Sequence, residues 1–172
     1  DVTVHEELDE SFYVSVSRSK SRRFVFIEMQ STLVSEVLSL EATTPSGLFE
    51  PVVPRQENVE YSVAHHKDTF YIRTNRDALN FKLMAAPVGE SSDESNWREV
   101  VPHRETVLLS SVDVFEEHLV LGERKDGLRQ LRVIRWADLA EHYIAFDEPI
   151  YVAFASGNPE FKTTKLRYVY SS

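Results

Sequence analysis

The feature that most constrains this chain is a repeat of short segments in which apolar and polar residues alternate. Such alternation is typical of β-strands, because successive side chains point to opposite faces of a sheet. Four related segments start 46, 49 and 47 residues apart, namely FVFIEM at Phe24, FYIRTN at Phe70, LVLGER at Leu119 and LRYVYS at Leu166. Each follows another strand-like segment, and the first three precede two more. The pattern predicts a repeated unit of four strands, with half of a fourth unit at the end.

A period near 45 residues with four strands per unit is typical of β-propeller blades. We therefore expect an all-β fold, a partial β-propeller, that forms a single domain over residues 1–172. Its blade-like units are predicted at about 9–55, 56–103 and 104–147, with a half blade at 148–172. An antiparallel sandwich also has short, evenly spaced strands and is the alternative. The four-strand grouping favours the propeller.

The first unit sets the positions of the expected strands, which start near Phe12, Phe24, Val37 and Phe49. The basic stretch SRSKSRRF, residues 17–24, lies between two alternating segments and is predicted to be a solvated hairpin turn. Residues 137–139 are too short for a helix and are predicted to be the turn between the third and fourth strands of the third unit.

The adjacent histidines His65 and His66 raise the question of a metal site or a catalytic base. We expect them to end the first strand of the second unit, with Lys67 and Asp68 as the tight turn that follows. Neighbouring residues on a strand point to opposite faces, so this pair cannot easily bind one ion together. The remaining histidines lack ligand spacing. No metal site is predicted.

Composition and motifs limit the function classes. The formal net charge of −9 argues against a nucleic-acid partner, which needs a basic patch for the phosphates. No apolar run approaches the roughly 18 residues of a membrane helix. The chain has no cysteine, which is compatible with a reducing compartment, and a cytoplasmic location is expected. The glycines form neither G-x-S-x-G nor a phosphate-binding loop, so neither a catalytic centre nor a cofactor is expected.

The second unit, EYSVAHHKDTFYIRTNRDALNFKLM, resembles the propeller of the prolyl oligopeptidase family of serine peptidases. The recurring elements are Thr74-Asn75-Arg76, then Asn80-Phe81, then Leu83. The similarity extends over the whole chain, through segments such as WREVVPHRE, ERKDGLRQLRVI and IAFDEPIYV, and is greatest with the oligopeptidase B (protease II) branch.

This resemblance implies a parent chain in which a seven-bladed propeller covers an α/β-hydrolase domain with Ser, Asp and His. Such enzymes cleave short peptides after Arg or Lys, and the propeller restricts access to peptides short enough to enter. The present chain corresponds to about three and a half blades. It lacks the triad and the acidic residues that read the basic side chain, so it is expected to be inactive alone. Its expected partners are the hydrolase domain of the same parent chain and, through it, short basic peptides.

The resemblance also implies which residues face the peptidase cavity. In the family, these are the starts of the innermost strands and the loops after the second strands, here Tyr13, Ser31, Asn75 and Arg76. Purely structural roles compete with this assignment, because Tyr13 can be a packed strand aromatic, and Asn75 with Arg76 can be a turn held by the Asn side chain.

The segments that enter the inner strands are acidic, and they are expected to reach the same face of the propeller. Asp147 and Glu148 complete the predicted cavity rim, and Glu57, Glu60 and Glu105 occupy the preceding two segments. A cleft lined by one sign of charge attracts ligands of the opposite sign. The alternative is that these residues are ordinary solvated loop charges.

Two other functions remain open from the sequence: a non-enzymatic propeller-like module that binds proteins, and a small β-sandwich with a function of its own. An open arc of blades also leaves strand edges and apolar faces uncovered. We therefore expect the fragment to self-associate.

Overall fold

The structure is a computed structural model that describes residues 3–172, and almost all of its regular structure is strand. Among these residues the one helical element is a 3-10 turn, η1 (Glu94–Asn96). The strands are β1 (Tyr13–Arg18), β2 (Phe24–Gln30), β3 (Ser35–Glu41), β4 (Glu50–Val53), β5 (Tyr61–His66), β6 (Thr69–Thr74), β7 (Lys82–Pro87), β8 (Arg98–Val101), β9 (Val107–Val114), β10 (His118–Lys125), β11 (Leu128–Arg135), β12 (Glu141–Tyr143), β13 (Val152–Ala155) and β14 (Tyr168–Ser171).

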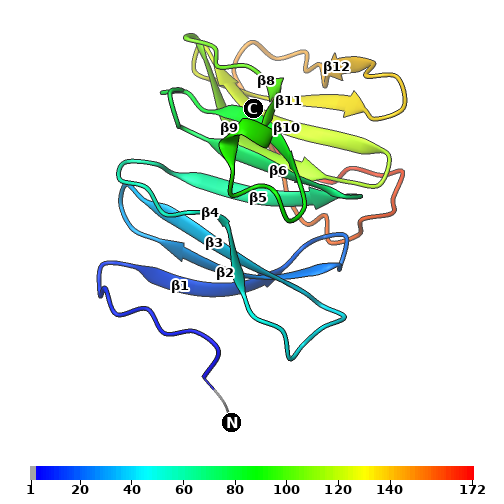
Figure 1. Ribbon diagram of the computed structural model, residues 1–172. Coiled ribbons are helices and arrows are strands. Elements are labelled where there is room, and N and C mark those ends of the chain that lie inside the picture. Colours follow the sequence, from blue (N-terminus) through cyan, green and yellow to red (C-terminus); the bar gives the residue numbers. More distant parts are fainter. Residues whose placement is uncertain (1–2) are drawn as a thin grey trace.

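The strands pair in chain order into three four-stranded antiparallel sheets, β1–β4, β5–β8 and β9–β12, and a two-stranded sheet, β13–β14. Figure 1 shows the sheets stacked along the molecule. This confirms the all-β fold class and the partial propeller. In the first unit β2 starts at Phe24 as predicted, and the other three strands start within two residues of the predicted positions. The hairpin turn after Arg18 and the turn before β12 are also where the sequence places them.

The second strand of each four-stranded sheet is buried on both faces, which strict alternation does not predict. In β2, Phe24 and Phe26 pack toward the second sheet, whereas Ile27 belongs to a cluster on the other face. In β6, Phe70 faces the first sheet and Tyr71 faces the third. Stacked sheets therefore share cores, and β6 serves an interface on either side, whereas the outer face of β2 is covered by Phe12, Leu38 and Phe49 of its own unit.

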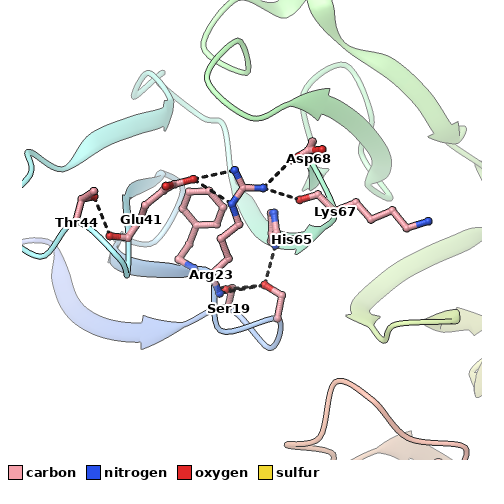
Figure 2. A network of polar contacts seen from close by, with 9 residues as sticks. Ser19, Arg23, Glu41, Thr44, His65, Lys67 and Asp68 are labelled. Carbon is pink, nitrogen blue, oxygen red and sulfur yellow. Dashed lines mark hydrogen bonds and ion pairs between the residues drawn. The ribbon is translucent and has the colours of Figure 1, made fainter.

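His65 lies in the interface between the first and second sheets (Figure 2). Its ring is edge-on to Phe24 and Phe70, with centroids 4.8 and 5.8 Å away, and its Nδ1 is 2.7 Å from the hydroxyl of Ser21. Nearby, Arg23 donates to Glu41 at 2.8 and 3.0 Å, to the Lys67 carbonyl at 3.1 Å and to Asp68 at 2.7 Å. The β1–β2 hairpin is thus anchored to the β5–β6 turn.

His66 points to the opposite face of β5 and serves the other interface. Its ring stacks on Trp136 at 4.6 Å, and its Nε2 lies 2.9 Å from the carbonyl of Glu116. The prediction that the two histidines end a strand, face opposite sides and precede a Lys67–Asp68 turn is confirmed. Residues 3–172 bring together no group of three or more histidines and carboxylates that could hold a metal ion.

One ion pair joins sheets that are not neighbours. Lys20, in the β1–β2 turn, pairs with Asp113 of β9, and its ammonium lies 3.8 Å from the centre of the Phe115 ring. Arg73 of β6 also reaches the third sheet, where its Nε donates to the Leu109 carbonyl at 2.7 Å. The three four-stranded sheets are therefore cross-linked by polar contacts as well as by their shared cores.

The two histidines make the stability depend on pH. Burial lowers the pKa of His65 to about 4, and burial also lowers the pKa of His66. The unfolded chain, with a histidine pKa of about 6.5, therefore binds protons first as the pH falls. We expect the free energy of unfolding that these two histidines contribute above pH 6.5 to be lost between about pH 6.5 and pH 4. His65 accounts for roughly 3 kcal/mol of this loss.

Urea unfolding across this range should show a smaller decrease for His65→Gln than for the unchanged chain. His142→Gln, at an exposed position, is the control and should keep the full pH dependence. Equal slopes for His65→Gln and the unchanged chain would contradict this role for His65.

The open ends of the stack carry exposed apolar side chains, and these should cause self-association. On β1, Val14 and Val16 are 49% and 70% exposed, and Val152, Phe154, Tyr168 and Val169 are exposed on the last hairpin. We expect concentration-dependent association in sedimentation, weakened by Val14→Lys with Val16→Lys. Ser62→Lys, at an exposed position of β5, should leave association unchanged. A chain that stays monomeric at high concentration would refute the prediction.

Candidate functional site

The candidate site is the end of the sheets at which their first strands begin. In the first sheet Tyr13 pairs with Gln30, so the start of β1 lies beside the end of β2 and the loop that contains Ser31. In the second sheet Tyr61 pairs with Thr74, which places Asn75 in the equivalent corner. The connecting segments 54–60, 102–106 and 144–151 enter β5, β9 and β13 at this same end of their sheets. We call this end the strand-start face.

Tyr13 begins β1 and is 86% exposed, so its ring is not packed in the core of the described residues. The polar groups of Ser31 are used locally. Its amide donates to the Val34 carbonyl at 2.9 Å, and its hydroxyl donates to the same oxygen at 3.4 Å. Ser31 therefore closes the β2–β3 turn, whereas the Tyr13 side chain is free to meet another molecule.

Asn75 holds the segment that leads into β5. Its side-chain oxygen accepts from the backbone amide of Glu60 at 2.8 Å, and its backbone amide donates to the Glu60 carbonyl at 3.1 Å. Its Nδ2 donates to the Asn58 carbonyl at 3.4 Å. The Ala78 amide then donates to the Asn75 carbonyl at 2.9 Å, which makes a turn in which Asp77 is left-handed, with φ of 49°. The turn that follows β6 is thus closed by backbone groups, and the Asn75 side chain holds the segment that leads into β5 rather than the turn itself.

Arg76 is neutralised within the chain. Its guanidinium pairs with Glu94 of η1 and donates to the side-chain oxygen of Gln56. Gln56 in turn donates to Glu94 at 2.9 Å. Arg76 thus joins the β6–β7 loop, the β7–β8 loop and the segment 54–60, and its charge is not available to a ligand carboxylate in this arrangement.

Asp147 and Glu148 lie in the last connecting segment, beside a cluster of aromatic rings. The ring of Phe146 stacks on Tyr170 at 4.7 Å and contacts Tyr151 at 4.6 Å. The Tyr170 hydroxyl donates to Glu148, and this hydrogen bond raises the pKa of the phenol. The aromatic cluster therefore supports the acidic part of the segment.

The strand-start face carries carboxylates that have no basic partner. In residues 3–172, none of the following forms an ion pair: Glu57, Glu60, Glu105, Asp147 and Glu148. Opposite charge at the same end of the sheets comes from Lys82 at the start of β7, Lys125 at the end of β10 and Arg129 near the start of β11. The arrangement can attract cations, and the acidic segments reach the same end as expected.

Sequence reasoning missed a buried carboxylate beneath this face, Glu123 of β10, which is 1% exposed. It accepts from Arg104 at 2.5 Å, from Arg132 at 3.4 Å and from the Tyr143 hydroxyl at 2.8 Å. Burial would raise the pKa of Glu123, but the hydrogen bonds and charges of these partners lower it below the ordinary value. The cluster fixes the segment 102–106 through Arg104. The sequence did contain a signal for this burial, because alternation along β10 places Glu123 on the same buried face as Leu119 and Leu121.

Three comparisons relate the chain to known proteins. A family model described as the N-terminal β-propeller domain of prolyl oligopeptidase matches residues 1–172. The chain is 40% identical over 173 residues to dipeptidyl aminopeptidase BI of Pseudoxanthomonas mexicana, and 30% identical over 172 residues to protease 2 of Moraxella lacunata. All of the chain is covered in both cases, but only 24% of either relative, so the chain spans about a quarter of their length.

Solved structures give the same similarity. Oligopeptidase B from Trypanosoma brucei, with covalently bound antipain, superposes with a TM-score of 0.89 at 29% identity. Oligopeptidase B from Leishmania major superposes with a TM-score of 0.90 at 27% identity. Each covers 99% of this chain, which corresponds to 26% and 25% of the respective structures.

Removing the Asn75 side chain should destabilise the segment that leads into β5. Asn75→Ala leaves the partly buried Glu60 amide without its acceptor, which costs about 1–3 kcal/mol. Asn75→Asp keeps the accepting oxygen and should lose less. Urea unfolding at neutral pH measures both, and an Asn75→Ala chain as stable as the original would show that this hydrogen bond does not hold the segment.

Proposed function

Because the chain belongs to the prolyl oligopeptidase family, as part of its N-terminal β-propeller domain, we propose that it forms the substrate-gating part of a serine peptidase. The chain supplies about three and a half blades of a seven-bladed propeller, divided near residues 55, 103 and 147. The strand-start face covers the hydrolase domain of the same parent chain. Tyr13, Ser31, Asn75 and Arg76 stand at the rim of the cavity between the two domains, together with the acidic segments.

The observation that carries this proposal is the sharing of one face by the inner-strand starts and five unpaired carboxylates. Asn75 and Arg76 shape this rim, because both are engaged within the chain. The exposed ring of Tyr13 is the rim side chain that is free to contact a peptide. Such a surface suits short peptides with positive charge.

We propose that the parent cleaves short peptides after Arg or Lys. Support comes from the negative strand-start face and from the similarity to protease 2 and to oligopeptidase B. The acidic residues that read the basic side chain would lie outside these 172 residues, so this part of the chain supplies attraction at longer range. We also propose a cytoplasmic location for the parent, with which a segment without cysteine is compatible.

A second candidate is the release of dipeptides from peptide amino termini, which the name of the 40% identical relative suggests. The two candidates differ in how they treat a free α-amino group. A dipeptide-releasing enzyme recognises that group at a fixed distance from the cleaved bond, whereas cleavage after Arg or Lys does not require it. Carboxylates at the cavity rim would attract the cationic amino terminus as well as basic side chains.

The full-length parent should hydrolyse N-blocked peptide amides that end in Arg or Lys, and should be inactivated by a serine-directed inhibitor. The 172-residue chain should not hydrolyse them, because the triad lies outside it. Preference for unblocked dipeptide amides would select the second candidate. Turnover by the purified 172-residue chain that resists the inhibitor would refute the assignment of the chemistry to another domain.

The acidic segments should accelerate capture of basic peptides. In the full-length parent, Asp147→Asn with Glu148→Gln should reduce kcat/KM for a basic peptide several-fold at low salt. The loss should shrink as the Debye length falls to about 8 Å near physiological ionic strength.

The control replaces two exposed carboxylates at the other end of the sheets, Glu90→Gln with Glu117→Gln, and should change kcat/KM little. If the Asp147/Glu148 variant is folded and its salt dependence matches that of the unchanged enzyme, the carboxylates do not steer substrate.

A further inference from the structure

A cleft of about 600 Å³ lies between the second and third sheets, toward the end opposite the strand-start face. The β5–β6 turn supplies Lys67, and the segment after β11 supplies Trp136. Tyr71 of β6, Arg98 of β8 and Arg132 of β11 also line it. We call this space the interblade cleft. Its volume is within the range of small-molecule sites, which is about 300–1,000 Å³.

One wall of the interblade cleft is aromatic. The rings of Tyr71 and Trp136 lie 5.0 Å apart, and Trp136 is stacked on His66 at 4.6 Å. The indole nitrogen of Trp136 donates to the Phe115 carbonyl at 3.0 Å, which fixes the ring. This wall is therefore held in place before any ligand arrives, and a planar apolar group can pack against it.

The Tyr71 hydroxyl has no partner within the described part of the chain, although the residue is only 7% exposed. By contrast, the hydroxyl of the equally buried Tyr61 donates to the Val53 carbonyl at 2.7 Å. Burial raises the pKa of Tyr71, and the positive charge of Arg98 opposes that effect. Tyr71 is thus a neutral donor close to a cation, at the surface of a cleft.

The cations of the cleft outnumber its carboxylates. Neither Lys67 nor Arg98 forms an ion pair within residues 3–172. Arg132 pairs with Glu141 at 2.5 Å and with the buried Glu123 at 3.4 Å, but its Nε is buried without a partner. Glu99 and Glu141 are the carboxylates of the lining. In a chain with a net charge of −9, this local excess of positive charge favours an anion.

We propose that the interblade cleft binds a small aromatic carboxylate, with its ring against Tyr71 and Trp136 and its carboxylate at Arg98. The Tyr71 hydroxyl donates to the same carboxylate, and Lys67 adds charge at the rim. The cleft is separate from the strand-start face, so the ligand is not the peptide that the parent hydrolyses. Two sources share this chemistry: a free aromatic acid, and the carboxyl-terminal aromatic residue of a peptide.

The test uses the full-length parent with its peptidase centre blocked by a serine-directed inhibitor, so that binding at that centre does not contribute. Calorimetric titration with 3-phenylpropionate and with N-acetylphenylalanine represents the two sources. Tighter binding of the first points to a free acid, and tighter binding of the second to a peptide carboxyl terminus. The neutral 3-phenylpropionamide should bind about tenfold more weakly than its acid, because it lacks the charge-assisted hydrogen bonds.

Arg98→Met should weaken binding of both acids about tenfold, and Tyr71→Phe should weaken it about fivefold while keeping the ring. Arg124→Met, at an exposed position of β10, is the matched control and should bind like the unchanged protein. Arg98 is exposed and Tyr71→Phe preserves packing, so both variants should fold. The proposal is overturned if neither acid binds at millimolar concentration, if acid and amide bind equally, or if Arg98→Met has no effect.

Discussion

The structure depends on burying both faces of the second strand in each four-stranded sheet. β6 and β10 are shielded because another sheet lies against each face, whereas the outer face of β2 packs against Phe12, Leu38 and Phe49 of its own unit. Phe70 and Tyr71 are neighbours in sequence, yet they belong to different cores. Each sheet is thus stabilised mainly by its neighbours, as in other repeat architectures.

This shared burial explains what the sequence could predict. Strand number, order and turns follow from the spacing of apolar segments, and the segment that starts at Phe24 was located to the residue. The opposite orientations of His65 and His66 follow from the period of two residues on a strand. Burial on both faces could not be read from the alternating pattern, because it depends on which sheets lie against each other.

The candidate site was predictable in its location but not in its contacts. Topology brings the starts of the first strands and the connecting segments to one face, and the repeat was sufficient to expect that. The partners of Arg76 and Glu123 come from other loops and sheets, and no local spacing indicates them. The interblade cleft is similar, because Arg98 and Trp136 are far apart in sequence and meet only when the second and third sheets stack.

The contact of Lys20 with Asp113 and Phe115 limits how the sheets can move. Neighbouring sheets can slide or tilt a little while their shared core adapts. The Lys20–Asp113 contact joins the first sheet to the third and so spans the second sheet. A change in the angle between the first and second sheets must therefore be matched by a change in the angle between the second and third, or the contact breaks. The first three sheets should consequently move as one rigid body. If the parent opens to admit a peptide, the displacement should occur at the boundaries of this body rather than within it.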